Sequence, residues 1–374
     1  MNFASDNVYG IHPKILAAIE AANKGTSASY GYDDYSKRAE EKLSEVFEKD
    51  VRAFLVTTGT AANGLALSAL APSYGAIITH AEAHAAVDEC NSPEMFTGGA
   101  KIIGLHGTLG KITPEMVKKT LKGFIRGEHD PKPSAISVTN STELGRVYTP
   151  AEIKALAAAA VPQSPPPQTL EGEVHEIESP IRSRRMKFHM DGARFANAVA
   201  SLGLKPSEIT WKAGIDVMSF GGTKNGGMLL EAVVFFDTKL AEDFLYRRMR
   251  GGQLISKSRY LGAQMLAYLE GDLWLENARK ANGLAKRLAE GLKASNRIRI
   301  PIPTEANEIF AVMPRALHDK AQAAGAHYYD WMPDTLGPGG IADDEIFVRF
   351  VLSYATPPED VERFIGLIKD LSSR

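Results

Sequence analysis

Two short apolar runs in the middle of the chain, each ending in a polar functional group, place the strongest constraint on the fold. Residues 188–190 run into Asp191, and residues 217–220 run into a glycine- and threonine-rich turn that carries Lys224. Short apolar runs bounded by turn residues are typical of buried strands, and strands that alternate with helices form mostly parallel sheets. The pattern therefore predicts an open α/β sheet with Asp191 and Lys224 at its carboxyl edge, where such sheets bind ligands.

A lysine and a carboxylate at one sheet edge suggest the chemistry of pyridoxal 5'-phosphate (PLP). Lys224 would form the Schiff base, and Asp191 would keep the pyridine nitrogen protonated so that the ring acts as an electron sink. Each residue alone is weaker support, because a lysine in a glycine turn is usually solvated and Asp-Gly is common turn chemistry. The segment does not fit the spacing G-x-x-x-x-G-K-[ST] of a P-loop.

The segments HMDGARFANA and SFGGTKNGG together resemble the signatures of the low-specificity L-threonine aldolase and phenylserine aldolase family. The resemblance extends over nearly the whole chain. It implies a PLP-dependent enzyme of the beta-eliminating lyase superfamily with the fold-type-I, aspartate-aminotransferase-like architecture. We accordingly expect a large PLP-binding domain with a mostly parallel sheet over residues 1–250, and a smaller α+β domain over residues 251–374.

Composition is consistent with a cytoplasmic enzyme. The chain has 374 residues and a formal charge of −2, which gives no reason to expect a nucleic-acid or membrane-surface partner. The single cysteine, Cys90, cannot form an internal disulfide, and neither a signal peptide nor an apolar run of membrane-spanning length is present. We therefore expect a cytoplasmic location.

A phosphate site is expected where the strand over residues 53–57 meets the sequence TGTAAN, residues 58–63. A turn of small residues at a helix amino terminus leaves backbone N–H groups free and directs the helix dipole at an anion. Simple capping of the helix by Thr58 or Thr60 is the alternative. The resemblance favours the phosphate site and places Gly59, Thr60 and Asn63 near it.

Two histidines, His80 and His84, raise the alternative of a metal site. With Asp88 they are spaced four apart and would share one face of a helix. However, His80 falls at an expected strand end, and H-x-E-x-H differs from the zinc-protease pattern H-E-x-x-H. We therefore predict no metal. The resemblance instead implies that His84 stacks on the cofactor ring and handles protons, a role that suits imidazole near neutral pH.

The loop after the strand expected over residues 134–139 departs from the family pattern. Many members carry a histidine there, whereas this chain has Thr142-Glu143. The departure puts a second catalytic histidine in doubt. Glu143 could be either a solvated residue or part of the site.

Residues 161–185 interrupt the α/β pattern. They contain Pro162, the run PPP over residues 165–167, and the basic run RSRR over residues 182–185, none of which continues a helix. Relatives connect these elements by a shorter link, so we interpret the segment as an inserted flexible loop. If the insertion displaced the Asp191 strand, the protein would be a non-catalytic scaffold.

The resemblance assigns further site residues. Arg194 would bind the cofactor's phenolic oxygen or neighbouring groups, with a helix-start ion pair to Asp191 as the alternative. Thr223 would support phosphate or substrate, and Lys257 would reach a neighbouring subunit's phosphate. The remaining candidates, expected to contact substrate, are Ser5, Tyr30 and Asp33.

In the last third of the chain, the periodicity of Leu, Met and Ala predicts one long helical region over residues 260–294. Arg349 lies within an apolar strand, where an unpaired charge is expensive and an anionic partner is expected. The resemblance implies that this partner is the substrate α-carboxylate, held by a bidentate fork. A structural salt bridge is the alternative.

The resemblance implies retro-aldol cleavage of L-threonine, L-allo-threonine or related β-hydroxy-α-amino acids to glycine and an aldehyde. Lys224 and His84 would be catalytic: Lys224 would carry the cofactor, and His84, directly or through water, would remove the β-hydroxyl proton. The family's shared sites imply a homodimer or homotetramer. β-Elimination and transamination remain alternatives, because they would use the same Lys224 and Asp191 and differ only in products.

Overall fold

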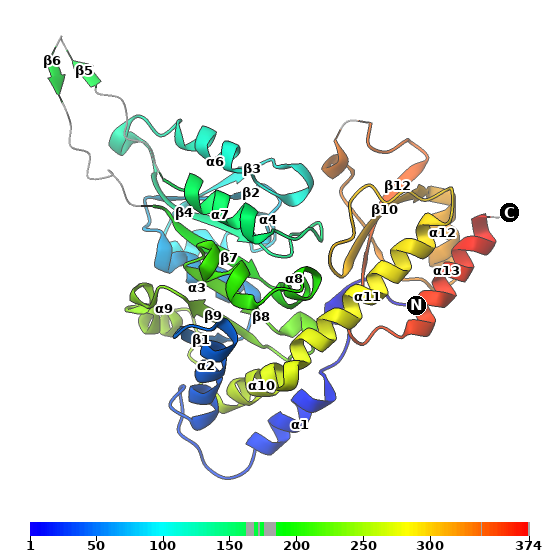
Figure 1. Cartoon of the computed structure of the whole chain (residues 1–374), viewed down its shortest axis with the longest axis horizontal. Helices are drawn as coiled ribbons and strands as arrows, with labels where there is room; N and C mark the ends of the chain where they lie inside the picture. Colours follow the sequence, from blue (N-terminus) through cyan, green and yellow to red (C-terminus); the bar gives the residue numbers. More distant parts are fainter. Residues whose placement is uncertain (162–167, 171–172, 176–184, 338, 373–374) are drawn as a thin grey trace.

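The computed structural model describes residues 1–161, 168–170, 173–175, 185–337 and 339–372. A sheet of seven strands forms its centre, in the order β1-β9-β8-β7-β4-β2-β3 (Figure 1). Strands β8, β7, β4, β2 and β3 run parallel, while β9 pairs antiparallel with both β8 and β1. The sheet strands are β1 Arg52–Val56, β2 Gly75–His80, β3 Lys101–Leu105, β4 Lys132–Thr139, β7 Lys187–Gly192, β8 Val217–Gly221 and β9 Glu231–Phe235.

Helices cover both faces of this sheet (Figure 1). The larger helices are α1 Pro13–Ala22, α2 Asp34–Phe47, α3 Gly59–Leu70, α6 Pro114–Leu121, α7 Pro150–Ala159, α8 Phe195–Leu202, α10 Arg259–Leu269, α11 Leu273–Lys293, α12 Arg315–Ala323 and α13 Pro358–Ser372. The shorter ones are α4 His84–Val87, α5 Ser92–Thr97 and α9 Phe244–Arg250. A capping box opens α7: the side chain of Thr149 accepts from the N–H of Glu152, and the side chain of Glu152 accepts from the N–H of Thr149.

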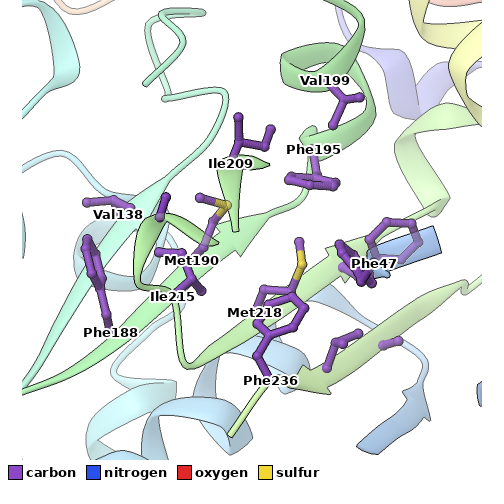
Figure 2. Packing of buried hydrophobic residues seen from close by; sticks show 14 of the residues in the cluster. Phe47, Val138, Phe188, Met190, Phe195, Val199, Ile209, Ile215, Met218 and Phe236 are labelled. Carbon is purple, nitrogen blue, oxygen red and sulfur yellow. The ribbon is translucent and has the colours of Figure 1, made fainter. Parts of the chain in front are cut away.

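Alternating side chains along the central strands separate the two faces of the sheet. Phe188 and Met190 point to one face, where they pack in a cluster with Phe195 of α8 and Phe47 of α2 (Figure 2). Because successive side chains of a strand point to opposite faces, Asp191 is directed to the other face, toward α3. Asp191 therefore lies on the face of the sheet opposite this cluster.

A smaller antiparallel sheet lies at the other end of the molecule, in the order β10-β12-β11. Its strands are β10 Glu308–Pro314, β11 Tyr329–Asp330 and β12 Glu345–Val351. The chain's own amino terminus packs there: Phe3 lies in the cluster formed by this sheet, α12 and α13, and its N–H donates to the carbonyl of His327. Both chain ends therefore lie beside the small sheet (Figure 1).

The long helical region expected over residues 260–294 consists of two helices. Gly271 and Asp272, both with positive φ (58° and 60°), break it between α10 and α11. α10 packs on α1 and α2, within the same cluster as the large sheet, whereas α11 reaches from that cluster into the cluster of the small sheet. The boundary between the two domains at residue 250 remains a prediction.

Most of the stretch 161–185, interpreted above as an inserted flexible loop, lies outside the described residues. The short strands β5 Gln168–Leu170 and β6 Glu173–His175 pair antiparallel within it. After it, β7 pairs in regular parallel register with β4 and β8. The extra residues therefore do not displace the strand that carries Asp191. Within the described part of the chain, no helix has the length and apolar character needed to cross a membrane.

Candidate active site

A pocket opens at the carboxyl ends of the central strands. Seven of the twelve predicted site residues line it, namely Gly59, Thr60, His84, Asp191, Arg194, Thr223 and Lys224. They come from segments spread over more than 160 residues, as expected for the crevice of an open α/β sheet. Asn7, Asn63, Glu143 and Glu231 also line the pocket.

Asp191, one residue before the end of β7, is a buried carboxylate whose two oxygens both accept hydrogen bonds. One oxygen accepts from the backbone N–H of Ala193 (2.9 Å), and the other accepts from Nδ2 of Asn63 on α3 (2.7 Å). The first bond fixes the side chain at the turn, and the second fixes it against α3. A buried, oriented carboxylate of this kind suits a partner for a protonated ring nitrogen.

Lys224 lies in a single helical turn, η6 (Thr223–Asn225), directly after β8. Thr223 holds this turn closed because its hydroxyl accepts from the N–H of Leu230 (2.9 Å). A Cβ at Gly221 would lie 2.6 Å from the carbonyl oxygen of Ala193, so glycine lets the Lys224 turn and the Asp191 turn approach closely.

The amino terminus of α3 supports the expected anion site. Thr58 is the N-cap and its side chain accepts from the N–H of Ala61, while Gly59 and Thr60 are the first two helical residues. The N–H groups of these first positions have no acceptor within a helix, and the helix dipole is positive there. The capping and phosphate interpretations of this sequence are therefore compatible. Asn63, expected near the phosphate, instead directs its amide to Asp191 and Glu89.

His84 is joined to Asp191 through two intervening side chains. Its Nδ1 lies 2.8 Å from Oε1 of Glu89, and that oxygen also accepts from Nδ2 of Asn63 (2.8 Å). The hydrogen bond to Glu89 raises the pKa of His84, whereas burial raises the pKa of Glu89. Sequence reasoning missed Glu89, because nothing in the spacing of HAAVDEC distinguishes it from Asp88.

His80 does not join this group. Its Nε2 lies 3.1 Å from the carbonyl oxygen of Gly107, and its Nδ1 accepts from the N–H of Glu82. Both ring nitrogens are thus engaged by the backbone. Among the described residues, no group of three or more His, Cys, Asp or Glu side chains is arranged to hold a metal ion.

Two further carboxyl groups face the pocket. Burial raises the pKa of Glu143 to about 7 and the pKa of Glu231 to about 7. Oε1 of Glu143 accepts from the backbone N–H of His84 (2.9 Å) and from the hydroxyl of Thr139 (2.7 Å). Of the two roles left open for Glu143 by the sequence, the solvated one does not fit this position. Glu231 was not predicted as a site residue, because the sequence EAVVFFD over residues 231–237 indicates only a buried strand.

Arg194 forms a buried ion pair with Asp6 near the amino terminus of the chain. Its Nε lies 2.8 Å from Oδ2 of Asp6, and its Nη2 lies 3.5 Å from Oε1 of Glu308. Burial opposes the charge of Arg194, but Asp6 and Glu308 outweigh it and raise the pKa of the guanidinium. The acidic partner is therefore Asp6, not Asp191 three residues earlier. Ser5, next to Asp6, caps the short helix η1 (Asp6–Val8) by accepting from the N–H of Asn7.

Arg349 lies on β12, outside the residues that line the pocket. Its Nη1 is 3.9 Å from Glu308, and its guanidinium stacks on Trp331 at 4.4 Å. No hydrogen-bond partner for its Nε is present within residues 1–161, 168–170, 173–175, 185–337 and 339–372. The salt-bridge alternative thus describes its contacts here, although the ion pair is long.

The last three predicted residues lie together in another region. Asp33 caps α2 and accepts from the N–H and hydroxyl of Ser36 and from the hydroxyl of Ser258. Tyr30 and Lys257 are exposed. The N–H of Tyr30 donates to the carbonyl of Ser256, which brings the two segments side by side.

The pocket fits PLP: a lysine, a buried oriented carboxylate and a helix amino terminus converge on it. The fold and the site define a PLP-dependent enzyme of fold type I. Residues 2–165 and 168–316 match the model of the beta-eliminating lyase family, and the chain belongs to that family.

The chain is similar over its whole length to known threonine aldolases. The low-specificity L-threonine aldolase of Pseudomonas aeruginosa is 39% identical over 370 residues, which cover 99% of this chain and 96% of that protein. The enzyme of the same name from Pseudomonas sp. is 38% identical over 372 residues, with 99% and 98% covered. The structure of Leishmania major threonine aldolase superposes with a TM-score of 0.86 at 25% identity, with 99% of each chain covered.

Proposed function

We propose that this protein cleaves L-threonine, L-allo-threonine or related β-hydroxy-α-amino acids to glycine and an aldehyde. The observation that carries the proposal is the convergence of Lys224, Asp191 and His84 on one pocket. The full-length similarity to low-specificity L-threonine aldolases supports the same reaction.

Bound PLP would supply an electron sink for the electron pair of the breaking Cα–Cβ bond. Lys224 is the proposed attachment point. Asp191, fixed by Asn63 and Ala193, is proposed to hold the proton on the ring nitrogen. The N–H groups of Gly59 and Thr60 are proposed to bind the phosphate.

We propose His84 as a proton carrier. Its Nδ1 is engaged by Glu89, so its Nε2 is the nitrogen left for exchange. Arg349 remains our proposed ligand for the substrate carboxylate. Its Nε has no hydrogen-bond partner among the described residues, and its ion pair with Glu308 is long. Both observations support a guanidinium that is free to donate hydrogen bonds to a substrate carboxylate.

We also propose that the active enzyme is a homo-oligomer. Tyr30 is exposed, as are other large apolar side chains, including Tyr32 (71%) and Tyr246 (78%). Exposed apolar groups of this size often mark protein interfaces. Light scattering after size-exclusion chromatography tests this proposal, and a monomer at working concentration would contradict it.

The decisive experiment combines a cofactor titration with a product assay. We expect the purified protein to gain visible absorbance with PLP and to release glycine and the matching aldehyde from L-threonine, L-allo-threonine or phenylserine. Lys224→Ala is expected to abolish both. Pyruvate with ammonia, or a keto acid, in place of glycine would assign a different reaction to the same site.

A further inference from the structure

Glu143 lies in a loop that the fold holds firmly against the pocket. The loop follows β4 and turns back on itself, with the N–H of Thr142 donating to the carbonyl of Arg146 (2.8 Å). The side chain of Asn140 accepts from the N–H of Tyr148 and donates to its carbonyl, which anchors the base of the loop. Glu143 is therefore positioned by a rigid scaffold.

The two carboxyl oxygens of Glu143 differ in their surroundings. Oε1 accepts two hydrogen bonds, from the N–H of His84 and from the hydroxyl of Thr139. Both of these hydrogen bonds go to Oε1, and the side chain lines the pocket together with Lys224 and Asp191. Oε1 thus orients the group, and Oε2 is the oxygen that we assign to a ligand.

We propose that Glu143 is a further catalytic residue, which accepts the proton of the substrate β-hydroxyl group. This inference rests on the proposed function. As the Cα–Cβ bond breaks, the hydroxyl proton moves to Oε2, the Cβ–O bond becomes the aldehyde carbonyl, and the electron pair of the broken bond remains with Cα. A proton returned to Cα completes glycine, so the reaction neither gains nor loses protons overall.

The charges around Glu143 fit this role. Burial is the main cause that raises its pKa to about 7, and the negative charge of Asp191 adds to the rise. His84, Arg194 and Tyr148 also face it. The carboxyl group consequently exchanges protons near neutral pH, where general acid–base catalysis is most effective. The hydrogen bond to Glu89 raises the pKa of His84, so more of this imidazole is protonated at a given pH and cannot take up the hydroxyl proton.

The test compares Glu143→Gln with the wild-type enzyme. Glutamine keeps the size of the side chain and an acceptor for His84 and Thr139, but it cannot take up a proton. Glu143→Asp keeps the acid on a shorter side chain. Glu128→Gln, at an exposed position, is the matched control.

We expect Glu143→Gln to lower kcat for L-threonine cleavage by at least about 100-fold, the range of one general base. The affinity for PLP, measured by absorbance, should not change. Exchange of the glycine α-proton in deuterium oxide should persist, because that reaction involves no β-hydroxyl group.

The rise of kcat/KM near pH 7 should disappear in Glu143→Gln and survive in Glu143→Asp. In the cofactor-free chain, the infrared difference between wild type and Glu143→Gln should contain a carboxyl band that titrates near pH 7.

Each result has a defined meaning. Full cleavage activity in Glu143→Gln would overturn the catalytic role, as would an equal loss of cleavage and of α-proton exchange, which indicates structural damage. If wild type releases no glycine from any of the three substrates, the proposed function itself fails and this inference with it.

Discussion

The hydrogen bond between Glu89 and His84 offers a direct test of the site's electrostatics. Glu89→Gln removes a carboxylate whose side chain is fully buried and whose Oε1 lies 2.8 Å from Nδ1 of His84. The bond raises the pKa of His84, because a negative partner stabilises the protonated ring. Its loss should therefore lower that pKa.

The size of the effect follows from the geometry. A hydrogen bond to a charged group contributes about 1.5–3 kcal/mol, and one pKa unit corresponds to about 1.36 kcal/mol. The His84 side chain is 39% exposed, so solvent screening favours the lower end of the range. We therefore expect Glu89→Gln to remove about 1.5 kcal/mol of stabilisation from the protonated ring, which lowers the pKa of His84.

The pKa can be measured by an NMR titration of the imidazole resonances in the cofactor-free chain. His84→Gln identifies the signal among the nine histidines. Glu41→Gln, on the exposed face of α2, is the control and should leave the signal unchanged. An unchanged or higher pKa in Glu89→Gln would refute the argument that Glu89 controls the charge of His84.

Two further predictions concern stability. Gly221→Ala should lower the free energy of unfolding in urea by about 1–3 kcal/mol, because the new Cβ meets the Ala193 carbonyl oxygen at 2.6 Å. Gly283→Ala on α11, where a Cβ meets nothing within 4 Å, should instead stabilise the protein; equal effects of the two changes would argue against the steric reason. The second prediction rests on His189, buried between Ser137 and Ser219, whose pKa burial lowers to about 4. Because the unfolded chain binds this proton more readily, the free energy of unfolding should fall by up to about 3 kcal/mol as the pH drops from about 6.5 to about 4. The fall should be smaller in His189→Gln, and identical pH profiles for the two proteins would contradict this prediction.

The sequence predicted those parts of the site that depend on strand order. Asp191 and Lys224 each follow a buried strand, and the carboxyl ends of parallel strands meet at one edge of the sheet. The same reasoning located Gly59 and Thr60, because a strand followed by a small-residue turn and a helix has a characteristic pattern.

The supporting residues could not be predicted in the same way. The contact between Asn63 and Asp191 joins positions 128 residues apart, and Glu89 meets His84 only because α4 ends after one turn. Neither contact leaves a periodic signal. The break at Gly271 was not predicted either. The apolar periodicity continues on both sides of Gly271, although the backbone at this residue is not helical.

Helix α11 links the unfolding of the two hydrophobic clusters. Its first turns contribute Leu273, Trp274 and Ala278 to the cluster of the large sheet, and its later turns contribute Leu288 and Leu292 to the cluster of the small sheet. Neither cluster can lose its packing without exposing one end of the same helix to water. The two halves of the chain should therefore melt together, in one cooperative calorimetric transition whose enthalpy matches the van't Hoff value.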